Sequence, residues 1–350
     1  MRLGIIVNDI KTELADYTTT RLAIAATNLG HDVWYMGVGD LACDPDEKTH
    51  GRARRVPDKK YRSCDVYLAA LQGKQANSKR IILDELDVLL LRNDPAIDVN
   101  TRPWARLVGI NFGRLAMRNG VIVLNDPYGL SQAVNKMYLQ SFPEKVRPRT
   151  LITRDRGEIK DFIAEQGGSC ILKPLAGSGG RNVFLVRPQD GINLNQMIDA
   201  VATEGYIIAE EYLPEASKGD TRMFLMNGLP LRCKGRYAAI RRVRPIGDSD
   251  IRSNLTAGAV AKKAIVTEQM LELAEMIRPK LIQDGMFFVG MDIVGDKLIE
   301  INVFSPGGLD STEKLEGVSF CREVIHALEH KVEYRLQNQQ GFNNIEIATL

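Results

Sequence analysis

Three residues with oxygen-bearing side chains alternate with apolar residues near the C-terminal end of the chain. Within 287–303, Asp292, Glu300 and Asn302 occupy even-numbered positions, whereas most odd-numbered positions are apolar. This period of two predicts a pair of β-strands. Carboxylate and amide oxygens suit Mg²⁺, which proteins hold with one or two carboxylates while phosphate oxygens supply further ligands. We therefore expect a magnesium–nucleotide site; a solvated sheet face, where acidic residues are common, is the alternative interpretation.

The length of the turn between these strands decides whether the three side chains share a face. A Gly-Asp pair at 295–296 marks the turn. A strict two-residue loop there would place Asp292 on the face opposite Glu300 and Asn302. We therefore predict a three-residue bulged turn over 294–296, which leaves all three side chains on one face.

A glycine-rich segment follows a predicted strand that ends in Lys173. The segment contains Gly177, Ser178, Gly179 and Gly180. A strand, rather than a helix, begins near Asn182, which argues against both the dinucleotide-binding fingerprint and the P-loop, since each needs a helix directly after its glycines. What remains is a β-hairpin loop whose backbone N–H groups can fold over phosphates, with an ordinary turn as the alternative.

Composition narrows the class of protein. The chain has 350 residues, with 46 lysines and arginines against 44 aspartates and glutamates, so its net charge gives no indication of a nucleic-acid or membrane partner. Five scattered cysteines without a Cys-x-x-Cys pair argue against a disulfide framework or a zinc site. The apolar run at 3–7 is too short for a signal peptide and no run approaches a membrane span, so we expect a cytoplasmic protein.

The first part of the chain predicts a parallel α/β domain over 1–127. The expected strands are 3–7, 33–36, 86–92 and 121–124, and the expected helices are about 18–30 and 104–119. Strands that alternate with helices in this way form a parallel sheet with an open carboxyl edge. The polar, arginine-rich stretch 43–79 is expected to be a solvated loop or β meander, with a phosphate-binding patch as the alternative.

The rest of the chain is expected to form a central lobe over 128–212, a C-terminal lobe over 213–340 and a tail over 341–350. Ser131 is predicted to cap a helix that carries Lys136. The other expected elements are strands at 170–173, 206–209, 223–226 and 231–239, helices at 159–164, 267–281 and 317–338, a mobile basic loop at 241–263, a loop at 305–316 and a short strand in the tail around Ile345 and Ile347.

Taken together, these signals resemble the ATP-grasp superfamily, and the resemblance extends to bacterial glutathione synthetases over nearly the whole chain. The matching stretches are 86–95, 121–136, 171–180, 210–214, 219–222, 252–255 and 288–306. The resemblance implies a mixed α/β and α+β fold, in which an N-terminal parallel-sheet (pre-ATP-grasp) domain precedes an ATP-grasp fold of two α+β lobes.

The resemblance also implies roles for individual residues. The residues expected to bind the nucleotide phosphates are Lys136 and Lys173, with Gly177, Ser178, Gly179 and Gly180 as a lid. Those expected at the adenine and ribose are Glu210, Glu211, Tyr212 and Leu213. The expected metal ligands are Asp292, Glu300 and Asn302. The set expected to orient the acceptor and an acyl phosphate is Asp220, Arg222, Arg252 and Asn254.

The implied activity is an ATP-dependent, ADP-forming carboxylate–amine ligase that joins γ-glutamylcysteine to glycine, with Mg²⁺ or Mn²⁺ and ATP. Such enzymes need no protein nucleophile, and a homotetramer or homodimer is expected. Two alternatives stay open: a related ligase for another dipeptide or for glutamate addition to a protein, and a non-catalytic ATP-binding regulatory module. The first draws on 305–316, which is more similar to the SPG-L-x-x-x-E loop of ligases that add glutamate to proteins.

The resemblance is weaker between Gly228 and Arg252, where the chain is longer than typical bacterial enzymes. The second loop arginine of the family could therefore correspond to Arg241, Arg242 or Arg244. The sequence does not distinguish among the three.

Overall fold

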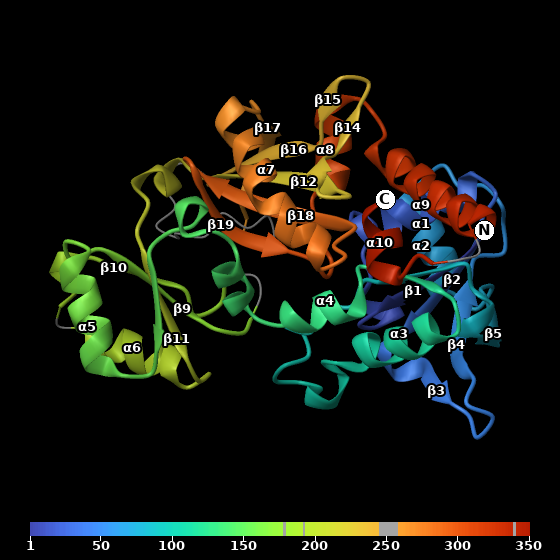
Figure 1. The fold of residues 1–350 in the computed structure, drawn as a ribbon, viewed down its shortest axis with the longest axis horizontal. Coiled ribbons are helices and arrows are strands. Elements are labelled where there is room, and N and C mark those ends of the chain that lie inside the picture. Colours follow the sequence, from blue (N-terminus) through green and yellow to red (C-terminus); the bar gives the residue numbers. More distant parts are fainter. Residues whose placement is uncertain (178–179, 192, 245–257, 339–340) are drawn as a thin grey trace.

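The computed structural model describes all residues except 178–179, 192, 245–257 and 339–340. In the described residues, most strands belong to three sheets. In Figure 1 the first sheet lies at the right, the second at the left and the third between them. No helix in the described part of the chain is long and apolar enough to cross a membrane.

The first sheet confirms the predicted parallel arrangement. Its strands are β1 (Arg2–Val7), β2 (Asp32–Gly37), β3 (Leu41–Cys43), β4 (Thr49–Arg55), β5 (Asn77–Ile82), β6 (Val88–Leu91) and β7 (Ile122–Leu124). The order is β3-β4-β2-β1-β6-β7, with β5 on β4, and the four strands from β2 to β7 in this order are parallel. Their carboxyl ends therefore lie at one edge of the sheet.

Helices flank this sheet, and one of them was not expected. They are α1 (Thr18–Asn28), α2 (Cys64–Gln72) and α3 (Val108–Arg118). The prediction for 43–79 is right for the antiparallel strands β3 to β5 but misses α2. This helix has only nine residues, is capped by Ser63 and buries Tyr67 and Leu71, so tertiary packing compensates for its short length.

The second sheet is small and antiparallel. It contains β8 (Thr150–Thr153), β9 (Cys170–Pro174), β10 (Phe184–Val186) and β11 (Ile207–Glu211) in the order β10-β9-β11-β8, with α5 (Arg156–Glu165) and α6 (Leu194–Ala202) packed on it. Strands β9 and β10 pair as a hairpin. The glycine-rich segment therefore joins two strands, as predicted.

The third sheet carries the hairpin with the two carboxylates. It contains β12 (Asp220–Met226), β13 (Leu229–Pro230), β16 (Ala239–Val243), β17 (Val260–Lys263), β18 (Phe288–Val294) and β19 (Lys297–Asn302), and its main order is β17-β16-β12-β18-β19. The predicted strand 231–239 is wrong in part, because β14 (Arg232–Cys233) and β15 (Arg236–Tyr237) form a separate hairpin there. The expected basic loop 241–263 begins and ends in strands, and its middle, 245–257, lies outside the described residues.

The helices near the C-terminal end correct two further predictions. They are α7 (Glu268–Gln283), α8 (Leu309–Glu316), α9 (Phe320–Gln337) and α10 (Asn344–Thr349). Residues 309–316 are helical rather than a loop, and Arg21 of α1 holds this helix by ion pairs with Asp310 and Glu313. The tail is helical rather than extended because Asn343 and Glu346 form a capping box.

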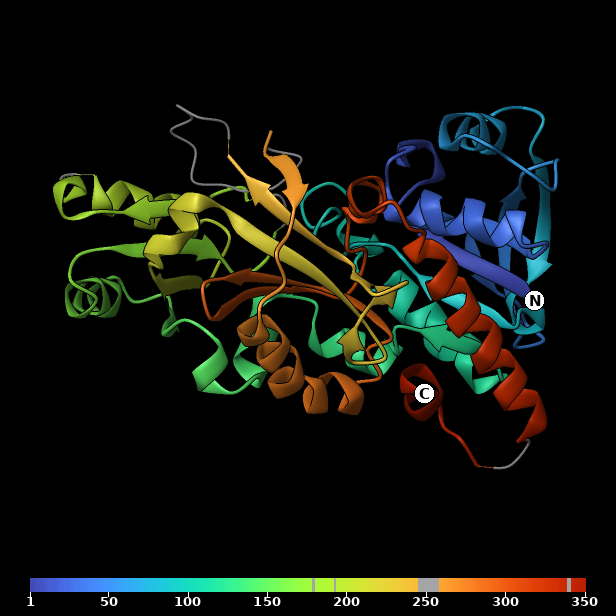
Figure 2. The same cartoon turned by 90° about the horizontal axis from the view of Figure 1, so that it is seen from above.

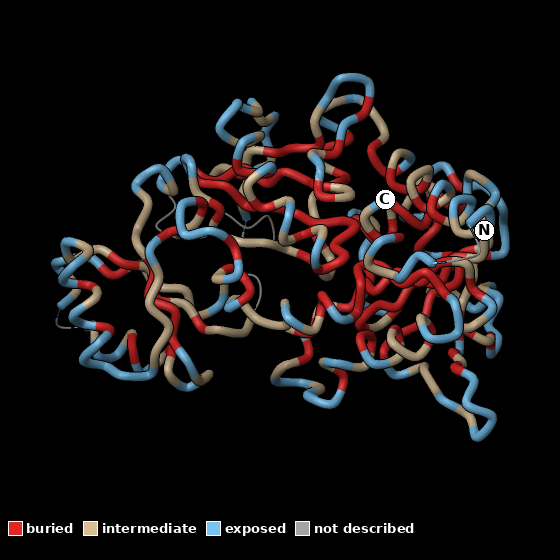
Figure 3. Tube along the Cα trace, viewed as in Figure 1, coloured by how far each residue is buried: buried red, intermediate tan, exposed pale blue. Residues whose placement is uncertain are grey.

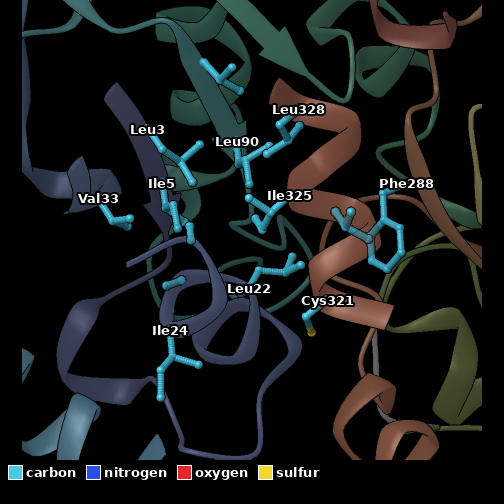
Figure 4. Packing of buried hydrophobic residues seen from close by; sticks show 14 of the residues in the cluster. Leu3, Ile5, Leu22, Ile24, Val33, Leu90, Phe288, Cys321, Ile325 and Leu328 are labelled. Carbon is cyan, nitrogen blue, oxygen red and sulfur yellow. The ribbon is translucent and has the colours of Figure 1, made fainter. Parts of the chain in front are cut away.

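Helix α9 returns to the N-terminal part of the molecule. It lies alongside α1, as Figure 2 shows, and its apolar residues recur at helical spacing. In Figure 4, Ile325 and Leu328 of α9 converge with Leu22 of α1 and Leu90 of β6. Figure 3 shows the buried residues concentrated in the sheets and in the helix faces turned toward them. One core therefore joins the first sheet to the last long helix.

A buried carboxylate in this N-terminal part leads to a prediction about stability. Glu13 is 8% exposed, and its Oε2 atom has no hydrogen-bond partner among the described residues. Burial raises the pKa of Glu13 from 4.5 to about 7, and the charge of Arg92 offsets only part of this effect. The folded state therefore holds a proton that the unfolded state releases between these two pH values, so stability falls as the pH rises through this window.

Glu13→Gln should remove this dependence on pH. We expect the variant to exceed the parent in free energy of unfolding by about 3 kcal/mol at pH 8, with the difference vanishing below about pH 4.5. Urea unfolding at a series of pH values measures the difference in free energy of unfolding between variant and parent. Glu165→Gln, at an exposed glutamate, is the control. If the difference in free energy of unfolding between variant and parent were the same at low pH and at pH 8, the prediction would be wrong.

Candidate active site

Four neighbouring strands bring charged residues into one row on a face of the third sheet. Arg242 of β16 pairs opposite Asp220 of β12, and Arg222, two residues further along β12, pairs opposite Asp292 of β18. Asp292 in turn lies directly opposite Glu300 of β19. Because residues two apart on a strand share a face, all five side chains lie on the same side of the sheet.

The turn between β18 and β19 differs from the prediction. The strands pair on either side of Gly295 and Asp296, so the turn has two residues and the predicted three-residue turn is wrong. The register instead shifts next to Asp292, where Ile299 of β19 is the extra residue. Such a bulge shifts the alternation of side chains by one position, as a longer turn would. The predicted consequence is confirmed, since Asp292 and Glu300 face each other.

Asp292 is the most enclosed member of the row. Its side chain is 1% exposed and accepts two hydrogen bonds of 2.7 Å from Arg222, and its Oδ2 lies 2.8 Å from Nη2 of Arg242. Burial alone would raise the pKa of Asp292, but the two guanidinium groups outweigh burial and hold this pKa below the usual value. The carboxylate is therefore ionised and charge-paired.

Two glycines make room for this arrangement. Gly219 has φ +92°, and a Cβ atom there would collide with the carbonyl oxygen of Arg242. A Cβ atom at Gly290 would crowd Pro306 and the side chain of Arg222. Larger residues at either position would push the arginines away from the carboxylates.

The strand register separates Arg242 from its neighbour Arg241, whereas Arg244, two residues further on, lines the same cavity as Arg242. Arg242 faces the charged row, where it binds Asp220 with contacts of 2.6 and 2.8 Å. Arg241 contacts Thr221 Oγ1 and the carbonyl of Lys218 instead, and Arg244 donates to the carbonyl of Ser217. Two other predicted members of the set, Arg252 and Asn254, lie outside the described residues, as do Ser178 and Gly179 of the predicted lid.

The two predicted phosphate lysines lie close to this row. Lys173 Nζ is 2.7 Å from Glu210 Oε2; the side chain of Glu210 is buried and that of Lys173 is 12% exposed. Lys136 donates from Nζ to the carbonyl of Gly177 and from its backbone N–H to the carbonyl of Leu175, so it tethers the glycine-rich segment. Burial lowers the pKa of Lys136, Glu300 opposes that change, and Lys173 adds to it.

The local structure around Lys136 corrects one prediction. The chain there forms α4 (Pro127–Gln132), capped by Asp126, and then a separate 3₁₀ helix that starts at Lys136 and is capped by Asn135. Ser131 therefore caps no helix that carries Lys136. The tighter turn places the lysine against the glycine-rich segment rather than along a continuous helix.

A cavity of about 250 Å³ connects the second and third sheets. Its charged lining includes Lys136, Lys173, Glu210, Asp220, Arg242, Asp292 and Glu300. Its apolar lining includes Ile171, Val183, Leu185, Leu213 and Ile299. The predicted hinge residues Glu210, Glu211, Tyr212 and Leu213 and the lid residues Gly177 and Gly180 also line it. A lining that contains both charged and apolar residues fits a molecule with a polyanionic part and a flat, less polar part.

Within the predicted hinge, two adjacent glutamates have different surroundings. Glu210 is 4% exposed and pairs with Lys173. Glu211 is half-buried, and its Oε2 accepts a hydrogen bond of 3.0 Å from the backbone N–H of Arg149. The carboxylate of Glu211 thus joins the hinge to the start of β8.

The donor set fits a hard divalent cation. Asp292, Glu300 and Asn302 offer carboxylate and amide oxygens, which Mg²⁺ and Mn²⁺ accept. Glu300 is half-buried, and its carboxylate has no hydrogen bond or ion pair with any described residue. No group of three or more His, Cys, Asp or Glu side chains in the described residues could hold a metal ion by itself. Phosphate oxygens would therefore have to complete the coordination of a cation at these three residues.

A smaller cavity of about 110 Å³ adjoins the first and reveals a residue that the sequence analysis missed. Both cavities are lined by Lys136, Lys173, Glu210 and Glu300, and the smaller one also by Asp94, Asn135, Asn302 and Ser305. Asp94 follows β6 at the carboxyl edge of the first sheet, and its backbone is fixed by two hydrogen bonds with Asn8. Burial raises the pKa of Asp94, while a hydrogen bond from the Ala96 N–H opposes the change. Asp94 belongs to the matching stretch 86–95, but the sequence alone does not single it out. Its position at the carboxyl edge of the sheet identifies it as a candidate site residue.

Comparisons with known proteins agree with this geometry. The family described as prokaryotic glutathione synthetase, N-terminal domain, matches residues 1–131, and the one described as prokaryotic glutathione synthetase, ATP-grasp domain, matches 135–317. A glutathione synthetase of Gloeobacter violaceus is 33% identical over 95% of this chain and 97% of its own length. A glutathione synthetase of Synechocystis is 30% identical over 94% of this chain and 99% of its own length.

Solved structures confirm the fold. D-cycloserine synthetase DcsG superposes with a TM-score of 0.64 over 94% of this chain and 99% of its own, at 14% identity. The ATP-grasp ligase PsnB gives a TM-score of 0.58 over 93% and 98%, at 18% identity. At such low identity the likeness concerns the ATP-grasp fold alone. The sequence matches, by contrast, span both domains, and the chain therefore belongs to the prokaryotic glutathione synthetase family.

Proposed function

We propose that this ATP-dependent ligase joins γ-glutamylcysteine to glycine through an acyl phosphate, with release of ADP and phosphate. The proposal rests on one observation above all: four members of the row, Asp220, Arg242, Asp292 and Glu300, line the same cavity as Lys136 and Lys173. Cations that could bind a polyphosphate and oxygen atoms that could bind a divalent ion thus line one cavity. The similarity to curated glutathione synthetases over most of the chain supports the choice of substrates.

In the first step a substrate carboxylate attacks the γ-phosphate of ATP, and two anions must approach each other. Lys136 and Lys173 would bind the phosphates and reduce their charge. Asp292, Glu300 and Asn302 would hold Mg²⁺, which when bound offsets the remaining repulsion. The apolar lining near Ile171 and Leu213 would receive the adenine, and the hinge 210–213 its polar edge.

In the second step an amine attacks the carbonyl of the acyl phosphate and phosphate leaves. The negative charge that develops on the carbonyl oxygen needs a fixed cation nearby, and Arg222 is held in place by Asp292 and by a hydrogen bond of 3.1 Å to the carbonyl of Gly307. Asp94, which lines the adjoining cavity, would bind the amino group of the acceptor and accept the proton that this group loses on attack. No side-chain nucleophile is required.

Phosphate release tests the proposal directly. The protein is incubated with ATP, Mg²⁺ and γ-glutamylcysteine, and amino acids are added one at a time. We expect glycine to increase phosphate release and to yield glutathione in equal amount. If another amino acid or a glutamate-accepting peptide stimulates release and glycine does not, the choice of substrates is wrong. If nothing stimulates release although ATP binds, the non-catalytic alternative is correct.

We also propose a homotetramer or homodimer in the cytoplasm, by similarity to the family. Sedimentation velocity at several protein concentrations measures the oligomeric state.

A further inference from the structure

The nitrogen donors around the carboxylate of Asp292 are concentrated on one of its two oxygens. Oδ2 receives Nη2 of Arg222 at 2.7 Å, Nη2 of Arg242 at 2.8 Å and Nδ2 of Asn302 at 3.3 Å. Among the residues that the structure describes, Oδ1 receives only Nε of Arg222, at 2.7 Å. A carboxylate oxygen offers two lone pairs, so Oδ2 is saturated by these nitrogen donors.

The two arginines hold Asp292 in different ways. Arg222 makes both of its carboxylate contacts with Asp292, and its remaining nitrogen holds the carbonyl of Gly307. Arg242 makes two contacts with Asp220, and Nη2 is shared between Asp220 and Asp292. If Arg242 left Asp292, it would keep its counter-ion; if Arg222 left, it would lose both carboxylate contacts. Arg242 is therefore the exchangeable partner.

A divalent cation needs the oxygen that Arg242 occupies. Mg²⁺ binds carboxylate oxygens at about 2.0–2.1 Å, which is closer than any N–H donor, and it repels a guanidinium group at the same atom. We propose that Arg242 is the resting counter-ion of Asp292 and that Asp292 exchanges it for the metal. This inference rests on the proposed role of Asp292 as a metal ligand.

The exchange has a consequence for anion binding. Arg242 lines the larger cavity together with Lys173 and Glu300. Once Asp292 no longer shares Nη2, that N–H group can donate to an anion in the cavity, such as a phosphoryl oxygen. Metal binding thus makes a cation available for the phosphate, and Arg242 acts as a positioning residue that couples the two ligands.

Manganese binding to the nucleotide-free protein tests the exchange. Mn²⁺ is titrated into the protein and the free ion is measured by electron paramagnetic resonance. Arg242→Gln removes the competing cation, so we expect it to bind Mn²⁺ about tenfold more tightly than the parent. Arg241→Gln is the matched control, because Arg241 contacts Thr221 and the Lys218 carbonyl rather than Asp292. The control should bind Mn²⁺ as the parent does.

Arg242→Gln leaves Asp220 buried without this counter-ion and could fail to fold. The double variant Asp220→Asn/Arg242→Gln replaces the charge pair with two amides, and the same increase in Mn²⁺ affinity is expected from it. An affinity equal to or below that of the parent in either folded variant overturns the exchange.

Glu300→Gln separates this inference from the proposed site. If Glu300→Gln weakens Mn²⁺ binding but Arg242→Gln leaves it unchanged, the site stands and the exchange is wrong. If neither substitution changes Mn²⁺ binding, the metal assignment fails and the exchange fails with it.

Discussion

Glu300→Gln should lower ATP-dependent turnover by roughly a hundredfold or more while the protein remains as stable as the parent. Glu300 faces Asp292 across the hairpin, and it has no hydrogen bond or ion pair with any described residue. Apart from the attraction between its charge and Lys136, the side chain therefore contributes little to the fold, whereas a proposed metal ligand contributes to the transition state. Phosphate release at saturating substrates measures turnover, and thermal unfolding measures stability.

Asp292→Asn should differ from Glu300→Gln in its effect on stability. Turnover should fall at least as far, but the amide leaves the buried guanidinium groups of Arg222 and Arg242 without the carboxylate between them. Breaking a buried charge pair on one side destabilises proteins by about 3–5 kcal/mol. The melting temperature of Asp292→Asn should therefore drop and that of Glu300→Gln should not. Normal turnover in Glu300→Gln would contradict the assigned role of this carboxylate.

The sequence was sufficient to place the charged residues on one face but not to locate the irregularity that puts them there. A longer turn and a bulge at Ile299 produce the same alternation of apolar and polar residues along 287–303. The two arrangements differ only in which backbone groups form hydrogen bonds, and the pattern of side chains does not determine those hydrogen bonds. The correct face was predicted because its hydrophobic pattern, rather than the turn, determines which side is buried.

Residues 309–316 show a different limit. The stretch follows two glycines and contains an Asp-Ser-Thr run, both of which are typical of a loop, although its leucines, glutamates and lysine favour a helix. The helix forms because Arg21 pairs with Asp310 and Glu313, nearly three hundred residues away in sequence. Tertiary contacts of this kind decide between competing local preferences.

The choice between Arg241 and Arg242 also required the register of β16 against β12. Arg241 and Arg242 are adjacent, so in a strand they must point to opposite faces, but the sequence does not say which one faces Asp220. The pairing of Asp220 with Arg242 across β12 and β16 decides it. For α10, by contrast, a signal was present: Asn343 and Glu346 have the spacing of a capping box, which outweighs the alternation of two isoleucines.

Lys173→Met should raise the dissociation constant for ATP by about a hundredfold. Lys173 lies 2.7 Å from Glu210, and both side chains are largely buried in the cavity wall. Removing the ammonium group deletes a phosphate partner and also leaves an unpaired carboxylate facing the phosphates. Truncating one member of a buried charge pair in a binding site typically costs about 2–5 kcal/mol of affinity. Isothermal titration with a non-hydrolysable ATP analogue in the presence of Mg²⁺ measures the change.

The double variant Lys173→Met/Glu210→Gln separates the two contributions. Because it contains no unpaired carboxylate, it should recover the stability that Lys173→Met loses, but it still lacks the cation and should bind the analogue well below the parent's affinity. Lys262→Met, at an exposed lysine of β17, should leave binding unchanged. If the double variant binds as tightly as the parent, Lys173 serves only to neutralise Glu210, and the phosphates must be held by Lys136 and the arginines instead.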